Sequence, residues 1–125
     1  MRFAAIDLGA SFIKSALVDT GSCTISHIER VPCPPFAKDL PFGYREIPVE
    51  DLLDITRRQL DRLLALAPEC AGIVSCGQMH GLVLTDGQGA PLTNAISWMD
   101  ERTLRPHPSG QGSYLDTLVS RLARQ

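Results

Sequence analysis

The sequence predicts an α/β domain in which a mixed β-sheet is flanked by helices, and two observations support this. Three apolar segments separated by short turns fill the first 31 residues, a spacing that is typical of an antiparallel meander. A long amphipathic stretch and then a short apolar strand follow. A strand that returns after a helix joins the sheet parallel to an earlier strand, so the sheet is expected to be mixed.

The meander begins with a hairpin. Phe3–Ile6 and Phe12–Asp19 are apolar segments of strand type, and the tight turn between them contains glycine. A further turn at Thr20–Ser22 leads to a third strand over Cys23–Val31, where the residue types are compatible with a β-sheet.

The hairpin turn carries unusual chemistry. Asp7 stands at the end of the first strand, where a buried carboxylate needs a partner or a metal ion. Gly9 lets the backbone approach a ligand closely. The amides of Gly9, Ala10 and Ser11 and the Ser11 hydroxyl are suited to donate to phosphate oxygens. Taken alone, however, an Asp and a Gly at this spacing are more typical of an ordinary turn.

The middle of the chain is expected to be a loop followed by one long helix. Repeated prolines forbid regular structure over Pro32–Pro48. Val49–Ala67 has helical periodicity, with Pro48 at the first helical position and Pro68 as the stop. The apolar stripe consists of Val49, Leu52, Leu53, Thr56, Leu60, Leu63, Leu64 and Ala67.

The second half alternates strands and loops before a final helix. Ala71–Cys76 is a short apolar strand, Gly77–Gly81 is a loop bounded by glycines, and Leu82–Thr85 reads as another strand. Ser113 and Asp116 have the spacing of a capping box, so a helix is expected to begin at Ser113.

Composition narrows the classes of function. The length allows one domain, and a net charge of −2 gives no indication of nucleic acid or of an anionic membrane. There is no apolar run of transmembrane length and no secretory signal. The four cysteines form no C-x-x-C pair, so we expect free thiols in a reducing cytoplasm.

A second set of polar residues lies further along. Gln78 and His80 sit in the glycine-bounded loop and carry donors and acceptors suited to polyol hydroxyls. Trp98, Asp100 and Arg102 follow, offering an aromatic wall, a carboxylate and a guanidinium, which together are sensible chemistry for a sugar site. For a lone histidine in a turn, a purely structural role would be favoured.

Three motifs in this order carry a resemblance. They are D-L-G-A-S in the hairpin, S-C-G-Q-M-H-G-L-V-L after the long helix, and I-S-W-M-D-E-R-T beyond it. Together they resemble the N-terminal domain of the FGGY family of carbohydrate kinases, from about Phe3 to Thr103. The G-Q-M-H-G loop followed by W-x-D-x-R is similar to ketose kinases of the xylulokinase and sedoheptulokinase kind.

The resemblance implies half of the actin-like ATPase fold, which is ribonuclease H-like, and transfer of the ATP γ-phosphoryl group to a ketose hydroxyl with Mg²⁺. It places Asp7 at the metal, usually through water, Gly9, Ala10 and Ser11 in the phosphate loop, and Lys14 near the phosphates. It places Gln78, Met79, His80 and Gly81 in the sugar loop, and Trp98 and Asp100 in a second sugar-contacting segment. ATP and a sugar would then be the small-molecule partners.

Two departures from the family pattern bear on activity. Ala10 stands where the family usually has Thr or Ser, which removes one hydroxyl donor to phosphate. The family's general-base Asp and its whole C-terminal domain would lie downstream, so residues 1–125 would form part of the N-terminal domain, with no catalytic base and no turnover alone. A missing partner domain would expose apolar surface and favour self-association.

Two alternatives remain at this point. One is a non-catalytic actin-like module that binds sugar or nucleotide without transferring phosphate. The other is an unrelated domain with accidental motifs, which requires three matches in order by chance. The residues leave the identity of the sugar open.

Overall fold

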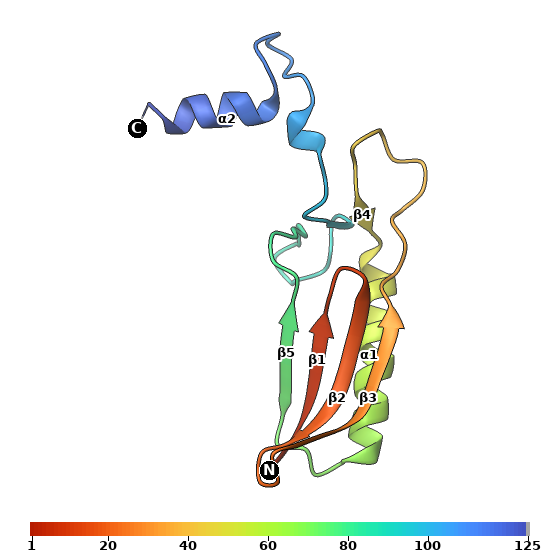
Figure 1. The fold of residues 1–125 in the computed structure, drawn as a ribbon. Helices are drawn as coiled ribbons and strands as arrows, with labels where there is room; N and C mark the ends of the chain where they lie inside the picture. Colours follow the sequence, from red (N-terminus) through yellow and green to blue (C-terminus); the bar gives the residue numbers. More distant parts are fainter. Residues whose placement is uncertain (125) are drawn as a thin grey trace.

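The computed structural model describes residues 1–124, and its main layer is a four-stranded sheet (Figure 1). β1 (Arg2–Leu8), β2 (Phe12–Asp19) and β3 (Thr24–Pro32) form the predicted antiparallel meander. β5 (Ile73–Gly77) lies on the other side of β1 and runs parallel to it, so the spatial order is β3-β2-β1-β5. The predictions of a meander and of a mixed sheet are confirmed.

One helix covers one face of this sheet. α1 (Val49–Leu66) lies against the sheet with its axis roughly along the strands, and the core between them contains Ala4 and Leu17 from the sheet with Leu63 and Ala67 from the helix end (Figure 1). Burying a leucine side chain of this kind stabilises the fold by about 1.5–3 kcal/mol. The helical periodicity of the sequence therefore identified the face that packs, except that Leu64 of the predicted stripe is exposed.

Element ends differ slightly from the predictions, for local reasons. Pro48 is the N-cap and not the first helical residue, because its ψ of 124° is extended. The third strand starts at Thr24, since Cys23 has a positive φ of 53°. One buried residue of α1 lies outside the predicted stripe: Gln59 is only 1% exposed.

A second, small sheet lies beyond the end of β1. β4 (Glu46–Ile47), within the predicted loop, pairs with β6 (Ala95–Ile96). The predicted strand at 82–85 is wrong, because that segment makes only isolated bridges, from Leu82 to Ile96 and from Thr85 to Pro91. The two bridges are three residues apart on one segment and five on the other, so they do not belong to one ladder, and between them the Leu84 amide donates to the Thr93 hydroxyl at 3.2 Å.

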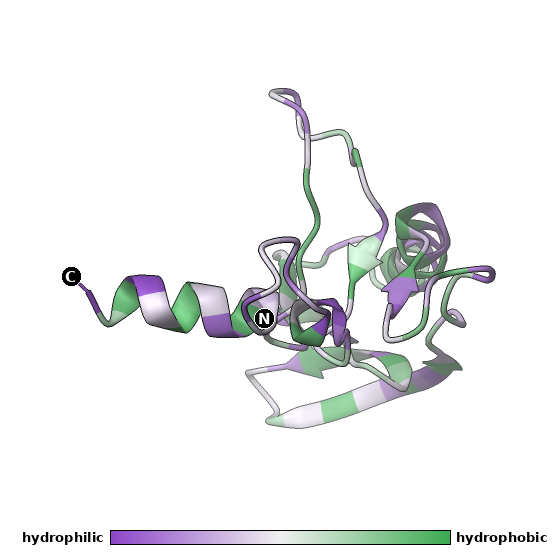
Figure 2. Cartoon of the chain, turned by 90° about the horizontal axis from the view of Figure 1, so that it is seen from above, coloured by the Kyte–Doolittle hydropathy of each residue, from purple (hydrophilic) through white to green (hydrophobic). Residues whose placement is uncertain are grey.

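The C-terminal segment extends away from the sheet (Figures 1 and 2). A short 3₁₀ turn, η1 (Arg102–Leu104), precedes α2 (Tyr114–Leu122). The predicted capping box is confirmed: Ser113 Oγ accepts from the Asp116 amide at 3.1 Å, and the Ser113 amide donates to Asp116 Oδ2 at 2.8 Å. Within residues 1–124, no helix is long and apolar enough to cross a membrane.

Candidate functional site

The hairpin turn and the glycine-bounded loop lie side by side. Leu8 of β1 is paired with Gly77 of β5, and the Gln78 amide donates to the Leu8 carbonyl at 3.0 Å. Parallel strands end at the same edge of a sheet, so the segments that follow them meet there. The register therefore brings together the two loops that the sequence assigned to phosphate and to sugar.

A cavity of about 240 Å³ lies at this junction. Gly9 lines it from the hairpin turn, Gln78 and Gly81 from the second loop, and Ser97 from the segment after β6. Among residues 1–124, the Gln78 Oε1 atom is buried and accepts no hydrogen bond. Buried polar atoms are nearly always paired in folded proteins, so this oxygen is a candidate acceptor for a ligand hydroxyl.

The hairpin turn is tightly constrained. A Cβ at Gly9 would lie 2.7 Å from the Phe12 carbonyl oxygen, which is shorter than real Cβ contacts allow. At the other end of the turn, the Ser11 carbonyl accepts from the Cys33 amide at 2.9 Å. Close backbone approach therefore favours glycine at this position, and the Cys33 amide anchors the other end of the turn.

Asp7 projects from β1 beside Lys14 of β2 and Cys76 of β5, the residues directly opposite it on the two neighbouring strands. Its Oδ2 atom accepts from Lys14 Nζ at 3.2 Å, and its Oδ1 atom accepts from Cys76 Sγ at 3.4 Å. The Lys14 bond, then the Cys76 bond, holds the pKa of Asp7 below its usual value, while the same contact raises the pKa of the Cys76 thiol. Asp7 is thus ionised.

The donor set at this position fits Mg²⁺ that keeps most of its water. Mg²⁺ in phosphate-transfer sites is bound through one or two carboxylates plus substrate phosphates. Asp7 is one such carboxylate, and its side chain is 37% exposed. In the part of the chain that the structure describes, no group of three or more His, Cys, Asp or Glu side chains forms a preassembled metal cluster.

The predicted sugar residues divide into a buried and an exposed set. Gln78 reaches the cavity, whereas Met79 and His80 are on the surface, as is Trp98, which is 55% exposed. His80 has a positive φ of 66°, a conformation that is uncommon for residues other than glycine. Such conformations cluster at ligand sites, because the surrounding structure must maintain them.

Asp100, by contrast, is fully engaged by the protein. Its side chain is 4% exposed and accepts four hydrogen bonds: three from the amide, Nε and Nη2 of Arg102 at 2.7–2.9 Å, and one from the Arg45 amide at 2.7 Å. The Arg102 contacts in particular lower the pKa of Asp100 to about 2. The carboxylate is therefore charged and points at arginine.

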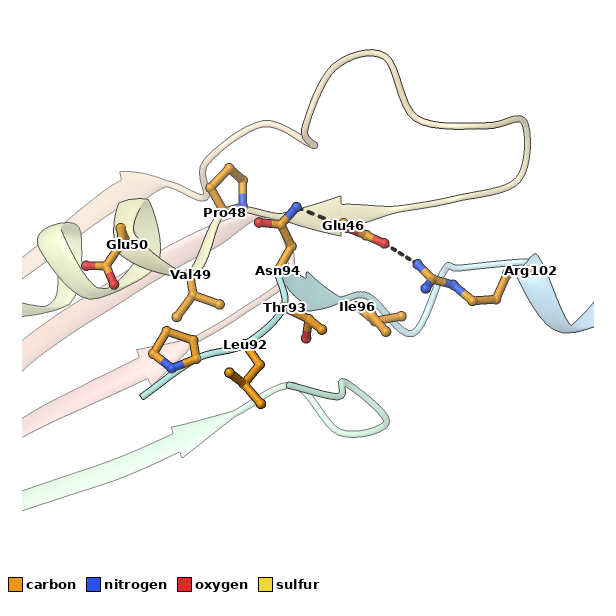
Figure 3. A pocket seen from close by; sticks show the side chains of 10 residues that line it. Glu46, Pro48, Val49, Glu50, Leu92, Thr93, Asn94, Ile96 and Arg102 are labelled. Atoms are coloured by element: carbon orange, nitrogen blue, oxygen red, sulfur yellow. Dashed lines mark hydrogen bonds and ion pairs between the residues drawn. The ribbon is translucent and has the colours of Figure 1, made fainter. Parts of the chain in front are cut away.

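Arg102 joins this segment to β4. Its Nη2 atom also donates to Glu46 Oε1 at 2.6 Å, and its guanidinium lies 4.2 Å from the centre of the Tyr44 ring. Glu46 in turn accepts from the Asn94 side chain at 3.0 Å, at the wall of a cavity of about 570 Å³ (Figure 3). Sequence reasoning missed all of these partners of Arg102, Asp100 included, because it placed the carboxylate and the guanidinium only as groups offered to a sugar.

Comparison with known proteins identifies the class to which this fold and site belong. Residues 3–107 match the N-terminal domain of the FGGY family of carbohydrate kinases, and the chain belongs to that family. The fold is accordingly that of the actin-like ATPases, as predicted.

Relatives of this chain include xylulose kinases. The chain is 36% identical over 107 residues to xylulose kinase of Bacillus subtilis and 33% identical over 105 residues to that of Staphylococcus xylosus, matching 78% of this chain in each case. It spans about a fifth of the length of these relatives, at 20% of each. The crystal structure of the Brucella ovis xylulose kinase superposes with a TM-score of 0.73 at 25% identity, over 98% of this chain and 25% of that one.

Proposed function

We propose that this chain supplies the phosphate turn and part of the sugar pocket of an ATP-dependent ketose kinase, which transfers the γ-phosphoryl group to a sugar hydroxyl. The observation that carries the proposal is the adjacency of the two loops at one sheet edge, where the Gln78 amide donates to the Leu8 carbonyl. Phosphoryl transfer depends mainly on positioning and charge neutralisation, so a donor nucleotide and an acceptor must be held side by side. The xylulose kinase relatives favour xylulose, a ketopentose, as the acceptor.

At the phosphate end, Asp7 would hold Mg²⁺ through water, and the amides of Gly9, Ala10 and Ser11 would donate to phosphate oxygens. When bound, the metal neutralises charge on the transferred group. Lys14 already lies 3.2 Å from Asp7 and would contribute a cation on the same face. The close approach enforced at Gly9 supports this role.

At the sugar end, Gln78, Met79, His80 and Gly81 would surround the acceptor, with the exposed Trp98 indole as an aromatic wall. The free Gln78 Oε1 would accept from a sugar hydroxyl. The second sugar segment also contains Asp100, and a hydroxyl would reach its carboxylate only by replacing one of the four donors that it has now.

The 125-residue chain is proposed to bind both ligands weakly and to transfer no phosphate by itself, since a base on the acceptor hydroxyl and the opposing domain that closes over the substrates are supplied elsewhere. The proposed use of ATP and the four free cysteine thiols both fit a protein of the reducing cytoplasm.

The test is a two-dimensional amide NMR titration of the purified chain with D-xylulose and, separately, with Mg²⁺-ADP. D-xylulose should shift signals of residues 77–81 and the Trp98 indole, and Mg²⁺-ADP those of residues 9–11, with dissociation constants of about 1 mM or weaker, or about −4 kcal/mol. Shifts outside these two loops, or none at all, would contradict the assignment. Sugar-dependent ADP formation by the chain alone would show that the needed groups are already present.

A further inference from the structure

Four polar side chains form a row across the sheet on the face opposite α1. Cys76, Asp7, Lys14 and Arg30 are directly opposite one another on β5, β1, β2 and β3. Residues directly opposite in adjacent strands project from the same face. Arg30 is therefore the next side chain after Lys14 in the row that contains the proposed metal carboxylate, about 10 Å, or two strand spacings, from Asp7.

Arg30 is held toward the hairpin turn. Its guanidinium carbon lies 3.4 Å from the centre of the Phe12 ring, and Phe12 is the first residue of β2 after the turn. A guanidinium stacked on an aromatic face keeps its N–H edge free for a ligand, because stacking uses the plane of the group and not its donors. Arg30 is exposed, so these donors face solvent.

The charge on Arg30 is the uncompensated one in the row. Lys14 is paired with Asp7 at 3.2 Å, whereas within residues 1–124 no carboxylate lies within 4.0 Å of the Arg30 guanidinium. The neighbouring Glu29 pairs instead with Arg62 of α1, on the other face. An anionic ligand at the turn would therefore meet Arg30 as its nearest free cation on this face.

We propose that Arg30 is a phosphate-binding residue, a second cation beside Lys14 that contacts the polyphosphate of the bound nucleotide. The proposal rests on the proposed function, because it takes the turn at Gly9–Ser11 as the phosphate site. Its chemistry suits the role: guanidinium groups bind phosphate oxygens through two parallel N–H donors, with geometry that lysine cannot offer. Arg30 fixes the polyphosphate from the β3 side and Lys14 from the β2 side, next to the Asp7 carboxylate that would hold the metal.

The test is isothermal titration calorimetry of the full chain with inorganic tripolyphosphate in the presence of Mg²⁺. Arg30→Gln should weaken binding about tenfold, or 1.4 kcal/mol. The matched control is Arg58→Gln, which removes the same charge from an exposed residue of α1, on the opposite side of the sheet, and should leave the affinity unchanged. Arg30→Lys keeps the positive charge but not the two parallel N–H donors of the guanidinium, so the affinity for tripolyphosphate should fall about threefold.

The outcomes separate this proposal from the proposed function. If Arg30→Gln binds tripolyphosphate like Arg58→Gln while Lys14→Gln binds it more weakly, Arg30 does not bind phosphate, and the assignment of the turn at Gly9–Ser11 is retained. If the unmodified chain does not bind tripolyphosphate, or if Lys14→Gln also binds it normally, the phosphate site itself is wrongly assigned. The proposal for Arg30 is then overturned as well. Equal losses in Arg30→Gln and Arg30→Lys, with a lowered thermal midpoint in both, would show that Arg30 only supports Phe12, and would overturn the proposal.

Discussion

The buried carboxylate of Asp100 should make the stability of the domain depend on pH between 7 and 2. Its pKa is lowered from the ordinary 3.8 to about 2, chiefly by the Arg102 hydrogen bonds. A depressed pKa contributes stability that is fully present above the unfolded value and is lost as the pH falls through the folded value. At 1.36 kcal/mol per unit, the contribution at pH 7 is about 2 kcal/mol, and it falls to roughly half by pH 3.

Urea unfolding of the unmodified chain and of Asp100→Asn at several pH values measures this contribution. The variant should be less stable by about 2 kcal/mol at pH 7, and the difference should shrink by about 1 kcal/mol at pH 3. Asp54→Asn is the matched control: its partner Arg57 is 3.7 Å away and both side chains are more than 60% exposed, so we expect a change within about 0.5 kcal/mol.

A difference between Asp100→Asn and the unmodified chain that stayed constant from pH 7 to pH 3 would refute this reasoning, because the effect would then come from shape and not from charge. Arg102→Met supplies a second check. It leaves a buried carboxylate without its main partner and should cost about 3–5 kcal/mol, more than the loss of the carboxylate itself. The double variant should be more stable than the sum of the two single changes predicts, because each change removes the same interaction.

Three further outcomes follow from the geometry. Asp7→Asn should weaken Mg²⁺-ADP binding with little change in D-xylulose binding, and equal losses of both in NMR titrations would indicate misfolding instead. Gly9→Ala should lower the free energy of unfolding by about 1–3 kcal/mol, because its Cβ would lie 2.7 Å from the Phe12 carbonyl; a urea midpoint like that of the unmodified chain would show that the turn relaxes freely. Ser113→Ala removes the N-cap of α2, worth about 1 kcal/mol, and should reduce helical circular dichroism without moving the sheet transition; a change in that transition would mean that α2 packs on the sheet.

The sequence predicted the elements whose periodicity is long enough to read. β1, β2 and α1 each repeat an apolar pattern over several residues, and the parallel placement of β5 follows because a helix separates it from β1. From that placement, the adjacency of the Gly9 turn and the Gln78 loop also follows. The contact between Cys76 and Asp7 could have been found in the same way, by aligning the two strands, because it depends only on their register.

The missed features depend on contacts between segments that are far apart in the chain. β4 and β6 have two residues each, too few to show any alternation, and Arg102 reaches Glu46 across 56 residues. The same contacts make the W-x-D-x-R segment a structural junction, since Arg102 connects it both to Asp100 and to the strand that leads into α1. The motif that resembles a sugar-contacting segment thus also connects the chain after β6 to β4, and its arginine holds Asp100 in place, while the Trp98 side chain remains exposed. Substitutions at Trp98 should therefore affect binding alone, whereas those at Arg102 should affect binding and stability together.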